Sequence, residues 1–210
     1  MQLQAEKEKL CFYMSGHPFE TYRQELSAIV SDNLNALDPK KSSSVTIGGL
    51  LIDLRKIFTK KGKKMAILTI DDGLGKIEIA IFSELLEETQ AFLKKDEIML
   101  VQGEISLDAY SNSIRMRADK IFTIPMAREA FGKRLLLRVK PDADFQKNLQ
   151  QCHQIMKQYD QGNMRASIIY QNEKGYVKIN MDPSYHVYPT DAFLDSINQL
   201  SGFSVEVEYA

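Results

Sequence analysis

The sequence predicts an α+β protein with two β-rich domains. Between residues 45 and 124, three predicted strands are followed by a helix and then by two more strands. The first strand is long, and the loop after it is strongly basic. This order is typical of the five-stranded Greek-key barrel called the OB-fold, which binds oligonucleotides through that loop. Residues 125–210 instead show the β-α-β-β-α-β order of ferredoxin-like domains.

A helical lead-in segment is predicted over residues 1–44. Residues 4–14 are expected to form a helix that ends at Gly16 and Pro18, because proline cannot continue a helix. A second helix is expected over 19–29, and a polar connector follows it. Since the chain starts in what looks like the middle of a helix, we expect it to be a piece of a longer protein. His17, at the corner between the helices, is expected to cap or pack.

The barrel strands are predicted from alternating apolar residues bounded by turn signals. They cover residues 45–58, 63–70, 76–82, 98–107 and 113–124. Gly48-Gly49 suggests a bulge or a sharp coil, which a long first strand needs if it is to serve two sheets. Ser83 is expected to cap a helix that continues to Phe92.

The second domain, residues 125–210, begins with a short helix over 126–131. Its predicted strands are 134–139, 164–171, 176–180 and 203–209, and its predicted helices are 144–159 and 190–200. Thr190 is expected to cap the last helix after Pro189. The 9 basic and 9 acidic residues between positions 133 and 210 are well mixed. This domain therefore shows no sign of a nucleic-acid surface.

Composition excludes several classes of protein. The formal net charge is −1, and no apolar run approaches the ~20 residues of a membrane-spanning helix. The two cysteines, Cys11 and Cys152, lie far apart and are expected to be free thiols in a reducing cytosol. We find no catalytic triad, no metal-ligand spacing and no phosphate-binding glycine loop. Asp71-Asp72 precedes a glycine and predicts a turn instead of a metal site, so neither catalysis nor a cofactor is expected in this chain.

A cationic loop is the best candidate for a binding site. Six of the 12 basic residues between positions 45 and 124 lie in the ten residues 55–64, and no acid falls between Leu54 and Ile70. Lysines neutralise phosphates without reading sequence, and aromatic side chains stack on bases. The predicted nucleic-acid-binding residues are Arg55, Lys56, Phe58, Lys60, Lys61, Lys63, Lys64, Arg115 and Arg117, with Phe82 and Tyr110 as weaker candidates. The alternative is that the run is only a solvated turn.

An apolar stripe on the last helix and strand leaves two interpretations open. It consists of Phe193, Leu194, Ile197, Leu200 and Phe203. Such a stripe usually forms the core of its own domain, but it could also form a surface for a protein partner.

The segment Tyr13-Met14-Ser15-Gly16-His17-Pro18 resembles the one that leads into the OB domain of bacterial replicative DNA polymerase III alpha subunits. The resemblance continues at Ile47-Gly48-Gly49-Leu50, at Thr59-Lys60-Lys61-Gly62, and at Leu68-Thr69-Ile70-Asp71-Asp72 with Gly75-Lys76-Ile77-Glu78. It extends through Val101-Gln102-Gly103-Glu104-Ile105-Ser106 and covers nearly the whole chain.

The resemblance implies a non-catalytic C-terminal part of a DNA-directed DNA polymerase. The parent's magnesium and its catalytic aspartates would lie in a palm domain outside this chain. The OB domain would contact single-stranded template DNA. The C-terminal domain would dock the tau subunit of the clamp loader, together with other replicase subunits in the cytoplasm. This implication raises the weight of the partner-surface interpretation of the last helix.

Two alternatives stay open from the residues alone. The OB domain could instead grip RNA, such as the anticodon stem-loop of a transfer RNA. Both domains could also be protein-docking modules, with the lysines serving only solvation.

Overall fold

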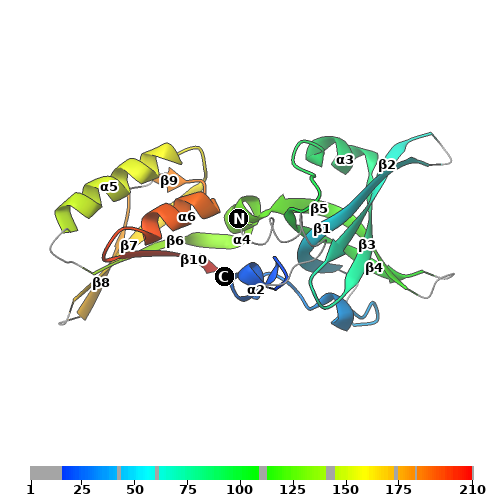
Figure 1. Cartoon of the computed structure of the whole chain (residues 1–210), viewed down its shortest axis with the longest axis horizontal. Coiled ribbons are helices and arrows are strands. Elements are labelled where there is room, and N and C mark those ends of the chain that lie inside the picture. Colours follow the sequence, from blue (N-terminus) through cyan, green and yellow to red (C-terminus); the bar gives the residue numbers. More distant parts are fainter. Residues whose placement is uncertain are drawn as a thin grey trace. The chain divides into compact units, whose positions relative to one another are not determined.

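The computed structural model describes residues 16–41, 44–59, 62–108, 113–140, 145–172, 175–182 and 184–209. The chain divides into two compact units, Met1–Thr123 and Ile124–Ala210 (Figure 1). The helix predicted over residues 4–14 lies outside the described residues.

The first unit contains a closed five-stranded barrel, which confirms the predicted OB-fold. Its strands pair in the order β1-β2-β3-β5-β4, and β4 returns to β1. β3 and β5 are parallel, and the other neighbours are antiparallel. The strands are β1 (Ser44–Phe58), β2 (Lys64–Asp71), β3 (Lys76–Phe82), β4 (Ile98–Leu107) and β5 (Ile114–Thr123). Alternate residues such as Ile47, Leu68 and Ile79 are fully buried in the barrel.

The long first strand serves two neighbours, as predicted, but not through a bulge at the glycines. Residues 44–50 of β1 pair with β4, and residues 50–58 pair with β2. The register shift lies between Leu51 and Asp53, so the predicted bulge at Gly48-Gly49 is wrong. The glycines allow close packing instead. A Cβ on Gly49 would lie 2.5 Å from the carbonyl oxygen of Asp71, and one on Gly48 would lie 2.9 Å from the Phe19 ring.

The helix between β3 and β4, α3 (Ser83–Thr89), lies against one end of the barrel (Figure 1). Ser83 is its first helical residue, and Phe82 holds the N-cap position with no side-chain cap bond. The predicted Ser83 cap is therefore wrong. The helix ends at Thr89, and the chain continues through turns in which the amides of Phe92 and Leu93 donate to the Thr89 carbonyl.

The lead-in contains α2 (Glu20–Leu26) and a short 3-10 helix, η1 (Leu34–Ala36). Phe19 and Leu26 are buried. His17 Nδ1 accepts a hydrogen bond from the Phe19 amide at 3.3 Å, and its Nε2 lies 3.7 Å from Asp71 Oδ1. The partly buried histidine thus packs before α2, as predicted, whereas the preceding helix of the predicted corner lies outside the described residues.

Asp72 joins the lead-in to the turn between β2 and β3. Its buried carboxylate accepts the amides of Leu34 at 3.0 Å, Leu74 at 2.9 Å and Gly75 at 2.7 Å. Asp71 Oδ1 accepts the Gly73 amide at 2.8 Å, where the glycine has a φ of +83°. The turn predicted for Asp71-Asp72 is confirmed, because both carboxylates bond to backbone amides.

The second unit is a mixed sheet with helices. Its elements are α4 (Ile124–Phe131), β6 (Gly132–Val139), α5 (Phe145–Gln158), β7 (Met164–Asn172), β8 (Gly175–Asn180), β9 (His186–Val187), α6 (Asp191–Asn198) and β10 (Phe203–Tyr209). The Thr190 hydroxyl accepts the Phe193 amide at 3.1 Å, confirming the predicted cap.

The sheet order β10-β6-β7-β8 differs from the ferredoxin-like expectation. The elements follow one another as predicted, with the short β9 added beside β7. In a ferredoxin-like split βαβ unit another strand separates the two parallel strands. Here β6 and β7 are direct parallel neighbours, joined through α5. Both α5 and α6 lie on the same side of this sheet (Figure 1).

Candidate nucleic-acid interface

The hairpin of β1 and β2 has two chemically different faces. Residues directly opposite each other in an antiparallel pair share a face. Lys56 pairs with Ala66, and Phe58 pairs with Lys64. Ala66 is fully buried in the barrel, so this row continues the interior side beyond the barrel end. We call it the inner face, and the opposite side the outer face.

The outer face joins four strands into one surface. In the register, Arg55 lies beside Ile67, which lies beside Ala80, which lies beside Arg117. The next row joins Ile57, Met65 and Phe82. Ile57 and Phe82 are 39% and 49% exposed. The outer face therefore presents exposed apolar side chains, Ile57 and Phe82, next to a row that has an arginine at each end.

Glu78 lies between two of these cations. Its Oε1 is 2.7 Å from Arg55 Nη2, and its Oε2 is 3.8 Å from Arg115 Nε. Arg55 also pairs with Asp53 at 3.2 Å, and Arg115 pairs with Asp108 at 2.7 Å. A phosphate binding at either arginine must compete with these carboxylates.

Arg117 and Asp53 also take part in ion pairs on the outer face. Arg117 Nη2 lies 3.0 Å from Glu104 and 3.5 Å from Asp119. The Lys95 ammonium, 2.7 Å from Asp53, holds the pKa of that carboxyl below its usual value. Glu78 lies on the same face of β3 as Lys76 and Ala80. The spatial role of Glu78 between two arginines was missed, because it depends on strand order.

The inner face carries cations of a different kind. The exposed side chains of Lys56 and Lys64 make no ion pair with any described residue. Phe58 lies between them in the register and is 71% exposed. These side chains line an open pocket of about 620 Å³ together with residues of α3.

The predicted nucleic-acid-binding residues that the structure describes therefore lie on two opposite faces of the hairpin and do not form one cluster. Arg55, Arg115 and Arg117 lie on the outer face, and Lys56, Phe58 and Lys64 lie on the inner face. Lys63 is exposed, and its amide donates to the Thr59 hydroxyl at 3.1 Å. Lys60, Lys61 and Tyr110 lie outside the described residues.

The residues predicted to bind a protein partner lie mostly inside the second unit. Phe193, Ile197 and Phe203 are buried in its core, where Phe193 meets the Tyr159 ring edge-on at 5.5 Å. Leu194 and Leu200 are half-buried and pack against the same core. The burial favours the core interpretation for the first three, since a partner cannot reach them without opening the domain.

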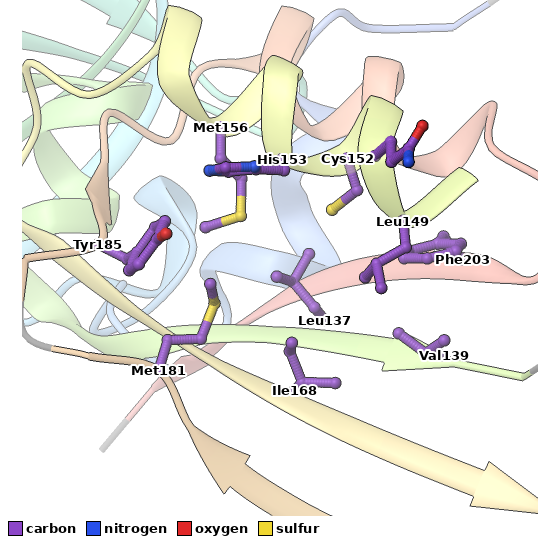
Figure 2. A pocket seen from close by; sticks show the side chains of 11 residues that line it. Leu137, Val139, Leu149, Cys152, His153, Met156, Ile168, Met181, Tyr185 and Phe203 are labelled. Carbon is purple, nitrogen blue, oxygen red and sulfur yellow. The ribbon is translucent and has the colours of Figure 1, made fainter. Parts of the chain in front are cut away.

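An apolar pocket of about 320 Å³ lies between α5 and the sheet (Figure 2). Leu149, Cys152 and Met156 reach it from α5, and Leu137 and Ile168 reach it from the sheet. Phe203 is the member of the predicted partner set that lines it.

Burial raises the pKa of the Cys152 thiol to about 11. Relative to the ordinary value of 9.0, this shift lowers the thiolate fraction near neutral pH by about 100-fold. In a Cys11→Ser variant, we expect Ellman's reagent to label Cys152 at most one-hundredth as fast as it labels glutathione. Labelling at the rate of a free thiol would contradict the burial. Full labelling in urea provides the control.

Within the described ranges, no helix is long and apolar enough to cross a membrane. Among the same residues, no group of three or more His, Cys, Asp or Glu side chains could hold a metal ion.

Residues 45–124 match the family described as "OB-fold nucleic acid binding domain". Among solved structures, the chain is similar to the mitochondrial single-stranded DNA binding protein Rim1 of S. cerevisiae. The TM-score is 0.35 and the identity 11%, over 39% of this chain and 95% of that one. The barrel and the family match define the class: the first unit contains a nucleic-acid-binding OB-fold domain.

The whole chain has more specific relatives. It is 30% identical to the DNA polymerase III subunit alpha of Vibrio cholerae serotype O1, over 100% of this chain and 18% of that protein. It is 28% identical to the Escherichia coli subunit, over 99% of this chain and 18% of that protein. The chain is homologous over its full length to the C-terminal part of the bacterial DNA polymerase III alpha subunit. It spans about 18% of the length of these curated relatives.

Proposed function

We propose that this chain is the non-catalytic C-terminal part of a replicative DNA polymerase, whose OB barrel binds single-stranded template DNA. The observation that carries the proposal is the outer face, where exposed Ile57 and Phe82 lie among Arg55, Arg115 and Arg117. Aromatic and apolar side chains provide stacking surfaces for bases, and arginines pair with phosphates. Strands 2 and 3 of OB-folds commonly carry such sites.

The chemistry of synthesis belongs to other parts of the polymerase under this proposal. Nucleotidyl transfer and its magnesium would be supplied outside this chain, which would hold the strand without a cofactor. The second unit would dock the tau subunit of the clamp loader, in the cytoplasm and alongside other replicase subunits. The support for docking is the full-length homology to the alpha subunit.

A titration of fluorescent oligonucleotides tests the proposal. The chain is mixed with single-stranded DNA or RNA of the same sequence at two salt concentrations, and anisotropy is recorded. Preferential, salt-sensitive binding of DNA is expected, because several cations would displace counterions from the backbone. Tighter binding of RNA would favour the RNA alternative. No binding of either at low salt, with retained capture of tau, would favour a purely protein-docking role.

A Glu78→Gln substitution tests the outer face, because it is expected to strengthen binding of single-stranded DNA instead of weakening it. Removing this carboxylate charge takes away one of the acidic partners of Arg55 and of Arg115, which keep Asp53 and Asp108, and so reduces the competition that a phosphate meets. We expect affinity for single-stranded DNA to rise about threefold at low salt, and the salt slope to steepen by about one counterion. Glu97→Gln serves as the matched control, because the Glu97 side chain is exposed and makes no ion pair with a described residue. Equal affinities for the two variants would show that the strand does not cross this face.

A further inference from the structure

The β1–β2 hairpin and α3 enclose a pocket that the inner face lines with Lys56, Phe58 and Lys64, and to which Ile57 and Met65 of the outer face also contribute. The pocket has a volume of about 620 Å³ and lies between the hairpin and α3. Its polar and aromatic lining comes from Lys56, Phe58, Lys64, Ser83, Glu87 and Gln90. Its volume falls in the range of roughly 300–1,000 Å³ that is usual for small-molecule sites.

Phe58 is the first sign of a ligand there. Its ring is 71% exposed at the end of β1, far more than the 39% of its neighbour Ile57 on the outer face. It is paired with Lys64, and Lys56 lies two residues before it on the same face. Aromatic rings flanked by cations are the usual means of holding an unstacked base together with its neighbouring phosphates.

The charge of the hairpin supports an anionic ligand. Lys56 and Lys64 make no ion pair with a described residue, whereas the outer-face arginines are all paired with carboxylates. A phosphate at these lysines would displace no ion pair among the described residues, although the Glu87 carboxylate lines the same pocket. They are therefore better placed for a backbone phosphate than Arg55 or Arg115.

The opposite wall of the pocket carries hydrogen-bonding groups. Glu87 and Gln90 are three residues apart at the C-terminal end of α3, both exposed and both lining the pocket. An ionised carboxylate accepts hydrogen bonds and cannot donate them. Glu87 therefore suits the exocyclic amino group of cytosine or adenine, whereas thymine presents O4 as an acceptor at the corresponding position and has only its N3–H to donate.

We propose that this pocket binds one unstacked base of a single DNA strand that also contacts the outer face. The base stacks on Phe58, its flanking phosphates pair with Lys56 and Lys64, and its amino edge donates to Glu87. This inference rests on the proposed binding of single-stranded DNA. It adds a second contact on the other side of the hairpin and a preference for amino-bearing bases.

Stacking is tested with the full chain and homopolymeric oligonucleotides of ~14 nucleotides, a length within the range that OB-folds cover. Phe58→Ala is expected to weaken binding of oligo-dC about tenfold, as expected for the loss of one stacked base. Phe58→Tyr should retain the affinity because its ring still stacks. Leu74→Ala is the matched control, since Leu74 is a comparably exposed apolar side chain (53%) in another loop of the same unit.

Base preference is the second readout. We expect the wild-type chain to bind oligo-dC about fivefold more tightly than oligo-dT, and Glu87→Gln to reduce this ratio towards one while leaving the salt slope unchanged. A ratio that Glu87→Gln does not alter, or a wild-type ratio near one, would overturn the assigned role of Glu87.

Photo-cross-linking separates this proposal from the proposed function. An oligonucleotide carrying 5-iodocytosine is irradiated with the chain, and the attached peptides are identified by mass spectrometry. Cross-links to the peptide that contains Phe58 support the pocket. Binding with cross-links confined to the peptide of Phe82 would overturn the pocket and leave the outer face intact. Failure of the wild-type chain to bind any single-stranded DNA would overturn both.

Discussion

Replacing Asp72 with alanine is expected to destabilise the first unit by about 3 kcal/mol, since a buried amide that loses its acceptor costs roughly 1–3 kcal/mol and the two part-buried amides each add less. The substitution leaves three amides without their partner, namely those of Leu34, Leu74 and Gly75. Asp72 is 2% exposed, so water does not readily replace the carboxylate. The lead-in should detach from the barrel before the barrel itself unfolds, because the Leu34 bond joins the two.

Hydrogen exchange measures this loss locally, which matters because two units need not unfold in one transition. We expect amides of η1 and of the β2–β3 turn to lose protection in Asp72→Ala, while those of β6 and β7 keep theirs. Asp72→Asn should lose less protection, because the side-chain amide oxygen of asparagine can still accept a hydrogen bond from a backbone amide. Asp32→Ala is the control, since within the described part of the chain its exposed carboxylate accepts only the neighbouring Asn33 amide. A loss below about 1 kcal/mol, the value of an ordinary single hydrogen bond, would contradict the bridging role.

The barrel was predictable because its signals are local. Apolar alternation in β3 and β4 gave both strands with their observed bounds, Lys76–Phe82 and Ile98–Leu107. The position of the bulge was not predictable, because Gly48 and Gly49 are explained by distant neighbours. Their hydrogens face the Phe19 ring and the Asp71 carbonyl, and a sequence pattern does not reveal which residues lie there.

The predicted sheet order of the second unit was wrong for a related reason. The element order β-α-β-β-α-β is compatible with both a split and an unsplit βαβ unit. Whether β7 pairs directly with β6 is decided by packing over the whole sheet. The cap at Thr190 was predictable, since a capping hydroxyl depends only on the adjacent turn.

The sequence predicted which residues belong to the candidate site, but it did not predict on which face of the hairpin each of them lies. A run of cations indicates a charged loop, but period-two alternation sends neighbouring residues to opposite faces. Arg55 and Lys56 therefore serve different surfaces, although they are adjacent in the chain. The carboxylates that neutralise Arg55 and Arg115 come from other strands, so the distinction between paired arginines and unpaired lysines required the strand register.

Phe193→Ala is expected to destabilise the second unit by about 4 kcal/mol, the usual cost of removing a buried aromatic ring. The Phe193 side chain is fully buried, packs edge-on against Tyr159, and belongs to the core that α6 shares with the sheet. The free energy of unfolding is measured by urea denaturation, with the signal of Tyr159 and its neighbours reporting on this unit. Ser196→Ala on the exposed side of α6 should cost far less, since its hydroxyl only bonds back to the Ala192 carbonyl.

The same variant tests whether the last helix contributes to the proposed docking of tau. If Phe193 is a core residue, capture of tau should fall only in proportion to the unfolded fraction, and a low temperature that restores folding should restore capture. Leu194→Ala and Leu200→Ala alter half-buried side chains that a partner can reach. A lower affinity for tau in either of these folded variants would locate a contact on this helix. Loss of tau binding by fully folded Phe193→Ala would contradict the core assignment, since a side chain that stays buried cannot contribute directly to an interface.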